Sequence, residues 1–146
     1  SPFHLQELVS EAAAAYREPD ESGNAITVKN GIDFSVDLEA DRAQLYRVFS
    51  NLISNAREAG ATVLDVVASK NAGELIIDLT DNGPGFSEKA RTKLFEPFAG
   101  SAREGGTGLG LVIVRDVLRA HGGDVELVDT GAGGSHFRIS LPDRSG

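Results

Sequence analysis

The sequence predicts a two-layer α/β sandwich, in which helices cover one face of a β-sheet. Some segments carry apolar residues at the spacing of an amphipathic helix, and others are short apolar runs bounded by turn residues, which is typical of strands. The chain has 146 residues, which is enough for one domain with a proper hydrophobic core. We therefore expect residues 1–146 to form a single α/β domain.

The first elements are expected to be a helix and a β-hairpin. Residues 3–17 carry apolar side chains at helical spacing, and residues 25–28 and 34–38 look like short strands. Asn30 and Gly31 lie between these strands and form a dipeptide that is typical of hairpin turns. The apolar positions of the helix are Leu5, Leu8, Val9, Ala12 and Tyr16.

A second amphipathic helix is expected between Asp41 and Gly60. Asp41 is a residue type that caps helix N-termini, and Gly60 is one that ends helices. Between them, one face of the helix is apolar, so this face should pack on the sheet. Its residues are Leu45, Val48, Phe49, Leu52 and Ala56.

The second half of the chain is expected to complete the sheet. Ser87 can cap a short helix that ends at Leu94, residues 96–107 lack periodicity and should form a loop, and residues 108–121 should form a helix. Two of the strands should bracket a turn at residues 130–134. The expected strands are 62–68, 74–80, 124–128 and 135–141.

Composition excludes several functions. The net charge of −8 argues against a general nucleic-acid-binding protein, because phosphate backbones need a basic surface. The absence of cysteine excludes disulfides and thiolate zinc sites. No apolar run is long enough to span a membrane, and no signal peptide is visible. An anionic ligand would have to meet backbone N–H groups or a metal ion.

The stretch Asp81-Asn-Gly-Pro-Gly85 directly follows an apolar strand. Asn-Gly-Pro-Gly ends a strand efficiently, but a turn does not require a carboxylate before it. Asp81 therefore suggests a turn that holds a ligand, with an ordinary turn as the alternative.

Asn51 and Asn55 lie one helical turn apart, with Glu58 nearby. This polar stripe should lie at the rim of the apolar face, where an amide oxygen can ligate a hard cation such as Mg²⁺. Asparagine is a poor helix former, so two copies in mid-helix are unusual. The alternative is a pair of ordinary surface asparagines.

Residues 105–111, Gly-Gly-Thr-Gly-Leu-Gly-Leu, lie at the start of an expected helix. Uncovered N–H groups and the positive end of a helix dipole together favour phosphate binding. The chain has no Gly-Lys pair, which excludes a P-loop, and the glycine spacing differs from that of a dinucleotide-binding fingerprint. The alternative is a flexible hinge.

The order of these motifs resembles the ATP-binding catalytic domain of bacterial sensor histidine kinases. This is the HATPase_c or GHKL family, whose superfamily includes gyrase B, Hsp90 and MutL. The resemblance extends from Leu5 to Pro142, and its four motifs look like the family's N, G1, F and G2 boxes. It implies the Bergerat ATP-binding fold: a mixed five-stranded sheet covered on one face by about three helices. The four boxes are Asn51–Asn55, Asp81–Gly85, Phe95–Phe98 and Gly106–Leu111.

The resemblance also implies a role for each matching residue. Asp81 would accept a hydrogen bond from the adenine amine, with Gly83 and Gly85 letting the backbone approach the base. Asn55 would ligate Mg²⁺, supported by Asn51. The Thr107 hydroxyl would also contact the phosphates. The backbone N–H groups that would bind the phosphates are those of Gly106, Thr107, Gly108, Leu109, Gly110 and Leu111.

Residues 87–107 would form the ATP lid, with Phe95 and Phe98 as its hinge. Arg103 could reach the terminal phosphate, although an ordinary solvated charge is the alternative. Glu58 occupies a position that is basic in many kinases, and we expect it to orient a metal-bound water.

Asn51 replaces the water-activating glutamate of related ATPases, which favours transfer to a protein acceptor over hydrolysis. None of the three histidines lies in the helical hairpin that carries the acceptor in such kinases, and residues 1–20 resemble the segment after that hairpin. We therefore expect a catalytic domain from a longer kinase, monomeric in isolation and without membrane insertion of its own. It would be cytoplasmic, even if the parent kinase is membrane-anchored.

The expected partners are the dimerisation and histidine-phosphotransfer domain of the parent kinase and a downstream response regulator. Two alternatives stay open. One is a kinase-like interaction module that binds no nucleotide. The other is a serine kinase of the anti-sigma-factor type or an ATPase of the same fold.

Overall fold

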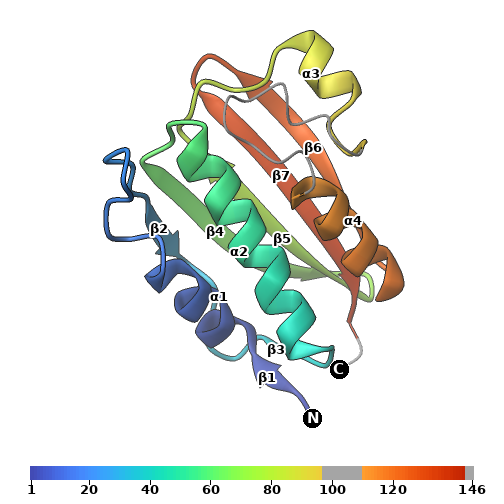
Figure 1. The fold of residues 1–146 in the computed structure, drawn as a ribbon. Helices are drawn as coiled ribbons and strands as arrows, with labels where there is room; N and C mark the ends of the chain where they lie inside the picture. The colour runs from blue at the N-terminus through green and yellow to red at the C-terminus, as the bar shows by residue number, and fades with distance from the viewer. Residues whose placement is uncertain (97–109, 144–146) are drawn as a thin grey trace.

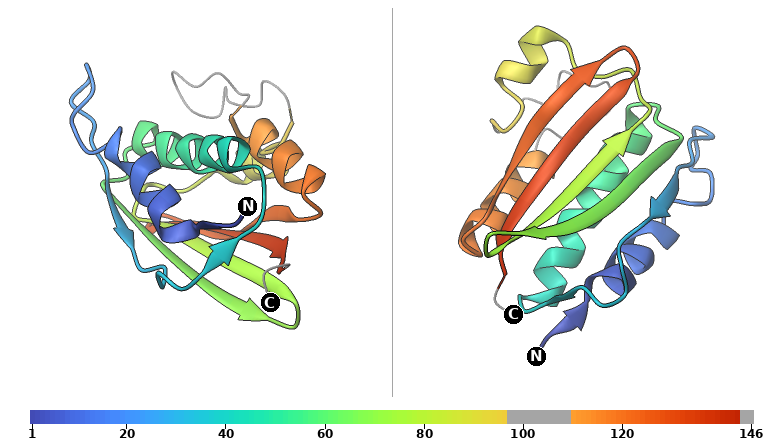
Figure 2. Two further views of the ribbon diagram at one scale, coloured as in Figure 1. Left: turned by 90° about the horizontal axis from the view of Figure 1, so that it is seen from below. Right: turned by 180° about the vertical axis from the view of Figure 1, so that it is seen from behind.

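The computed structural model describes residues 1–96 and 110–143, which form a sheet with helices on one face. The five-stranded sheet has the order β2-β4-β5-β7-β6 (Figure 1). Seen from behind, the strands are uncovered, and α1, α2 and α4 lie beyond them (Figure 2). The strands of this sheet are β2 (Thr27–Asn30), β4 (Val63–Asn71), β5 (Glu74–Asp81), β6 (Asp124–Gly131) and β7 (Gly134–Pro142). The helices are α1 (Leu5–Ala14), α2 (Arg42–Glu58), α3 (Glu88–Thr92) and α4 (Gly110–Ala120).

Helix α2 begins and ends where the sequence predicts. The Asp41 side chain accepts a hydrogen bond from the backbone N–H of Gln44, which satisfies a donor that the first helical turn leaves free. Gly60 has a φ of +102°, a backbone conformation that glycine adopts without steric cost. The helix therefore has a fixed length and presents its predicted apolar face to the sheet.

The alternation along β5 decides which side chains face the helices. Leu75, Ile77 and Leu79 are buried, whereas Asp78 between them faces the open side of the sheet. Asp81 follows Leu79 in the same phase, so its carboxylate also points to the helix-covered side. Its neighbours in the ladder are Leu64 of β4 and Ser135 of β7.

The predicted hairpin between residues 25–28 and 34–38 is wrong. β2 pairs in parallel with β4, and β3 (Asp37–Leu38) pairs instead with β1 (Phe3–His4) in a separate two-stranded sheet. The Asn30 amide donates hydrogen bonds to the Gln6 carbonyl and the Ser10 hydroxyl of α1, and Gly31 N–H donates to the Val66 carbonyl. These contacts carry the chain onward along β4, so it does not reverse at Asn30-Gly31.

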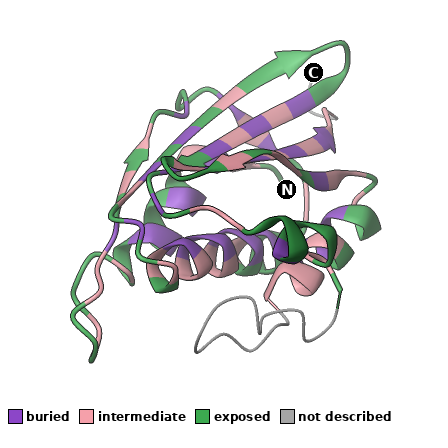
Figure 3. Cartoon of the chain, turned by 90° about the horizontal axis from the view of Figure 1, so that it is seen from above, coloured by how far each residue is buried: buried purple, intermediate pink, exposed green. Residues whose placement is uncertain are grey.

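The core lies between the helices and the inner face of the sheet. In Figure 3 the buried positions lie along the sides of α1 and α2 that face the strands. Among the described residues, no helix has the length and the apolar character that crossing a membrane requires. The largest fully buried side chains are Phe49, Leu5, Leu8, Ile26, Ile32, Leu45, Ile53, Leu75, Ile77, Leu79, Leu118 and Ile139.

Because the core lies between the two layers, replacing a buried and an exposed phenylalanine should change the stability by different amounts. Phe49 on α2 is 0% exposed, and Phe34 is 49% exposed. Phe49→Ala should lower the free energy of unfolding by about 3–5 kcal/mol, because it removes a packed ring and leaves a cavity. Phe34→Ala, the matched control, should lower it by less than about 1 kcal/mol. Urea unfolding followed by circular dichroism measures both, and equal losses would contradict this assignment of the core.

Candidate functional site

The end of β5, the C-terminal half of α2 and the start of α4 converge near the end of the molecule that carries α3 (Figure 1). This brings together Asp81, Asn51, Asn55 and Gly110, which the sequence had singled out in three separate motifs. Asp81, Asn55 and Leu111 line one common pocket. Residues of three separate motifs therefore lie close together in the fold.

Asp81 is a buried carboxylate, with 9% of its surface exposed. Its Oδ1 accepts hydrogen bonds from the backbone N–H groups of Gly83, at 2.8 Å, and Ser135, at 3.3 Å. These two bonds compensate part of the cost of removing the charge from water. Within residues 1–96 and 110–143, no donor bonds to Oδ2, so this oxygen is available to a ligand.

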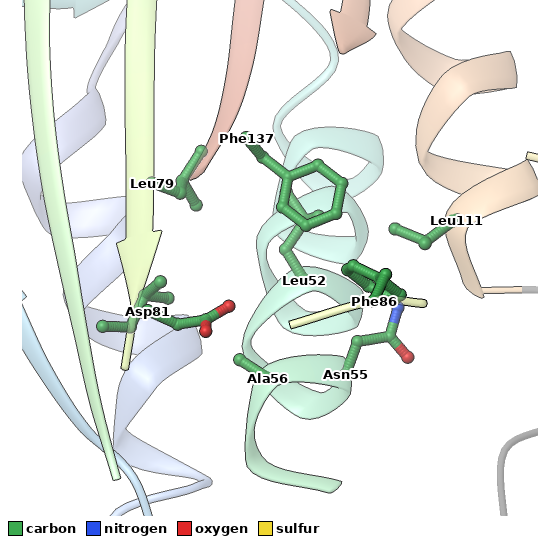
Figure 4. A pocket seen from close by; sticks show the side chains of 9 residues that line it. Leu52, Asn55, Ala56, Leu79, Asp81, Phe86, Leu111 and Phe137 are labelled. Carbon is green, nitrogen blue, oxygen red and sulfur yellow. The ribbon is translucent and has the colours of Figure 1, made fainter. Parts of the chain in front are cut away.

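The pocket beside Asp81 is apolar apart from two side chains. The carboxylate points from β5 toward α2, and the Phe86 and Phe137 rings lie near the same space (Figure 4). The two rings pack edge to face, with centroids 6.0 Å apart. The cavity has a volume of about 10 Å³, which is room for about one water molecule. Its lining residues are Leu52, Asn55, Ala56, Leu64, Leu79, Asp81, Phe86, Leu111 and Phe137.

Asn82 fixes the turn after Asp81 to the neighbouring strand. Its side-chain oxygen accepts hydrogen bonds from the backbone N–H groups of Thr62 and Val63, and its amide nitrogen donates to the Thr62 hydroxyl. Asn82 therefore holds the turn in place against the start of β4. The sequence marked it only as a turn residue.

The glycines of the turn permit close backbone contacts. Gly85 has a φ of +80°, and a Cβ there would collide with the carbonyl oxygen of Gly131. A Cβ at Gly83 would lie 3.1 Å from the Asp81 carboxylate. Gly85 is therefore needed for the turn to pack against the β6–β7 hairpin, and Gly83 leaves room for the Asp81 carboxylate.

No sequence motif indicated that the hydroxyl groups of two residues, Thr130 and Ser135, belong to this site. Thr130 accepts a hydrogen bond from the backbone N–H of Phe86 at 2.8 Å and bonds to the Ser135 hydroxyl at 2.9 Å. Ser135 is only 3% exposed. Both residues reach the site through strand pairing across β5, β7 and β6, which no local motif reveals.

The two asparagines of α2 are half-buried, as the sequence predicts for the rim of the apolar face, and both lie against the start of α4. Asn51 Nδ2 donates to the carbonyl oxygen of Gly110 at 3.5 Å. A Cβ at Gly110 would lie 3.2 Å from Asn55 Nδ2, so the glycine permits α4 to start close to Asn55. Glu58 is exposed at the end of α2 and does not line the pocket.

Gly110 and Leu111 form the first turn of α4, and Leu111 lines the pocket. The positive end of the α4 dipole therefore lies beside Asn55. The other predicted phosphate-binding residues lie outside the described residues, as do Phe98, Arg103 and residues 97–107 of the predicted lid. These phosphate-binding residues are Gly106, Thr107, Gly108 and Leu109.

Phe95, at the described end of the predicted lid, packs under a cation. The Arg115 guanidinium lies 3.9 Å from the centre of its ring, and Arg115 also pairs with Asp124 at 3.2 Å. Burial acts to raise the pKa of Asp124, but the Val125 N–H, a hydrogen bond from Arg119 and the charges of Arg115 and Arg119 outweigh it and lower this pKa. Asp124 therefore stays ionised at neutral pH and helps to hold Arg115 over Phe95.

No group of three or more His, Cys, Asp or Glu side chains that could hold a metal occurs in the described parts of the chain. A cation at this site would need the Asn55 amide oxygen together with oxygens from a ligand. Hard cations such as Mg²⁺ are commonly bound in this way, through few protein ligands and substrate phosphates.

Comparisons with known proteins give one consistent family. The family model described as "Histidine kinase-, DNA gyrase B-, and HSP90-like ATPase" matches residues 40–145. The nitrogen regulation protein NtrY of Azorhizobium caulinodans is 37% identical in an alignment 111 residues long that covers 69% of this chain and 14% of NtrY. Sporulation kinase A of Bacillus subtilis is 31% identical and matches 97% of this chain but 24% of its own length. The chain thus spans a minor part of these relatives.

Solved structures agree with this. The ATP-binding domain of PrrB from Mycobacterium tuberculosis superposes with a TM-score of 0.74 and 29% identity, over 99% of this chain and 98% of that domain. Full-length ShkA in complex with AMPPNP superposes with a TM-score of 0.77 and 28% identity, over 97% of this chain and 30% of ShkA.

The close packing of the turn predicts different effects for two glycines. Gly73 and Gly85 both have positive φ, but a Cβ at Gly73 would meet nothing within 4 Å. Gly73→Ala should cost about 1–2 kcal/mol of stability from its backbone conformation alone. Gly85→Ala should cost more, because its Cβ also collides with Gly131. Urea unfolding compares the two variants, and a Gly85→Ala cost no larger than that of Gly73→Ala would contradict the packing of the turn.

Proposed function

Because the chain belongs to the histidine kinase-, DNA gyrase B- and HSP90-like ATPase family, we propose that it is the catalytic domain of a sensor histidine kinase. It binds ATP with Mg²⁺ and donates the γ-phosphoryl group to a histidine of a separate dimerisation domain in a two-component system. The family and the two-layer fold that the sequence predicts are confirmed.

The observation that carries this proposal is the buried Asp81 carboxylate in an otherwise apolar pocket. Oδ2 accepts a hydrogen bond from the exocyclic amine of adenine, while Oδ1 stays bonded to the turn and to β7. The apolar side chains of the pocket pack on the base. The cavity holds about one water molecule, so the base needs more room than this structure provides.

The phosphate half of the site is built from α2 and α4. The Asn55 amide oxygen ligates Mg²⁺, which neutralises phosphate charge when bound. Asn51 holds Gly110 and thereby keeps the N-terminus of α4 directed at the phosphates. In the same proposal Arg103 would contact the terminal phosphate, and Glu58 would orient a water molecule near the ion.

The acceptor histidine belongs to another domain of a longer kinase. The chain covers 14% of NtrY and 24% of sporulation kinase A, which leaves most of the length of such proteins for other domains. Each of the three histidines of the chain already has a polar neighbour inside the fold. These neighbours are Asp37 for His4, the backbone of Val117 and Asp41 for His121, and Asp78 for His136.

Phosphoryl transfer depends mainly on positioning and charge neutralisation. At Asn51 the chain has an amide where a related ATPase has a carboxylate that activates water. Asn51 does not act as a base, so the site favours transfer to an incoming histidine over hydrolysis. A response regulator then takes the phosphoryl group from that histidine.

Asp81→Asn should weaken the binding of an ATP analogue by more than tenfold. The substitution keeps an oxygen for Gly83 and Ser135, but it presents an N–H₂ donor to the adenine amine and loses a bond worth roughly 1.5–3 kcal/mol. Asp78→Asn, on the open face of the same strand, is the matched control and should bind normally. Titration calorimetry with Mg²⁺ measures this, and unchanged binding by Asp81→Asn would contradict the adenine site.

Asn55→Ala should remove most of the dependence of binding on Mg²⁺, because the variant lacks the amide oxygen that ligates the ion. The same titration is run with and without Mg²⁺ on the wild type and the variant. Asn24→Ala, in the loop before β2, serves as a control. A variant that responds to Mg²⁺ as strongly as the wild type would exclude Asn55 as the ligand.

With ATP and the hairpin domain of its parent kinase, the chain should produce acid-labile phosphohistidine on the hairpin. Alone, it should phosphorylate itself little, because its histidines lie outside such a hairpin. Incorporation of labelled phosphate followed by acid treatment tests this. Acid-stable phosphoserine would indicate a serine kinase of the anti-sigma-factor type, and rapid release of free phosphate without the hairpin would indicate an ATPase.

A further inference from the structure

The Thr130 hydroxyl connects two walls of the pocket that belong to different parts of the chain. It accepts a hydrogen bond from the Phe86 N–H at 2.8 Å and bonds to the Ser135 hydroxyl at 2.9 Å. The Ser135 N–H in turn donates to Asp81 Oδ1 at 3.3 Å. Phe86 and Asp81 both line the pocket, so Thr130 links one residue of the pocket wall to the carboxylate proposed to recognise the base.

We propose that Thr130 is a positioning residue for nucleotide recognition. It acts through Phe86, Ser135 and Asp81 and does not touch the nucleotide itself. The proposal rests on the function proposed above, because it says that Thr130 keeps the residues of the adenine site in their relative positions. The hydroxyl fixes the distance between the turn after Asp81 and the β6–β7 hairpin.

The donors and acceptors of this chain of bonds are compatible with one another. Thr130 Oγ1 accepts from Phe86 and keeps its own hydrogen, so it can donate to Ser135 Oγ or accept a second bond from it. If Thr130 loses its hydroxyl, the Phe86 N–H loses this acceptor and Ser135 loses a partner in a nearly buried position. An unsatisfied buried polar group costs more than the bond contributed, so the turn should shift to find new partners.

The backbone around Thr130 does not depend on its hydroxyl. Thr130 pairs with Ser135 in the β6–β7 ladder, and Gly131 pairs with Gly134. Valine has almost the same shape as threonine and a high preference for strands. Thr130→Val therefore removes the hydroxyl and leaves the hairpin, which separates a positioning role from a merely structural one.

The experiment compares the wild type, Thr130→Val, Thr130→Ser and the control Thr27→Val, which changes an exposed residue of β2. Titration calorimetry with a Mg²⁺-bound ATP analogue should give a Kd about three- to tenfold weaker for Thr130→Val, which is the effect of one lost hydrogen bond. Thr130→Ser should bind as the wild type does, because serine restores the hydroxyl. Circular dichroism should show that Thr130→Val and Thr27→Val are both folded at the temperature of the titration.

A second readout needs no nucleotide. In the free protein, hydrogen exchange at the Phe86 amide should be faster in Thr130→Val than in the wild type and should return to the wild-type rate in Thr130→Ser. Unchanged exchange, or an unchanged Kd for Thr130→Val, would overturn the inference. A weaker Kd that Thr130→Ser fails to rescue would also overturn it, since the effect would then be structural.

If the proposed function is wrong, the experiment gives a different result from the one expected if only the role of Thr130 is wrong. In that case the wild type itself does not bind the ATP analogue, and the inference falls with the function. If the wild type binds and Thr130→Val binds equally well, only the role of Thr130 is wrong.

Discussion

A carboxylate buried in an apolar wall is the constraint on which the rest of this site depends. An ionised group in such surroundings is costly unless hydrogen bonds compensate it. Asp81 receives two backbone N–H groups, one from the turn that follows it and one from β7. Both donors are held by further contacts: Gly83 lies in a turn that Asn82 fixes to β4, and Ser135 lies in a ladder with β5 and β6. The sheet thus orients the carboxylate.

Helix α2 serves the core and the site at once. Its apolar face is buried, and the asparagines at the rim of that face meet the first residue of α4. Because the apolar face packs on the sheet, the rotation of α2 is fixed, and Asn51 and Asn55 cannot turn away from α4 without unpacking Phe49 and Leu52. The geometry of the proposed metal and phosphate site is therefore set by core packing.

The open face of the sheet carries charged side chains around Asp78, and their position follows from the same alternation. Asp78 accepts hydrogen bonds from His136 and Arg138 of the neighbouring strand, on the side away from the helices. One strand, β5, thereby supplies a charged side chain to solvent at Asp78 and a charged side chain to the pocket at Asp81. Asp81 follows Asp78 by three positions, an odd number, so the two side chains point to opposite faces of the sheet.

The sequence by itself determined the type of each main element and the rim position of Asn51 and Asn55, since these follow from local periodicity and capping. It predicted the family from the order of four motifs. The tertiary structure alone decided that β2 joins the sheet in parallel, where a local turn signal predicts a hairpin. It also decided that Thr130 bonds to Phe86 and that Asn51 meets Gly110, 59 residues away. Such contacts depend on the register and packing of distant segments, which no local pattern encodes.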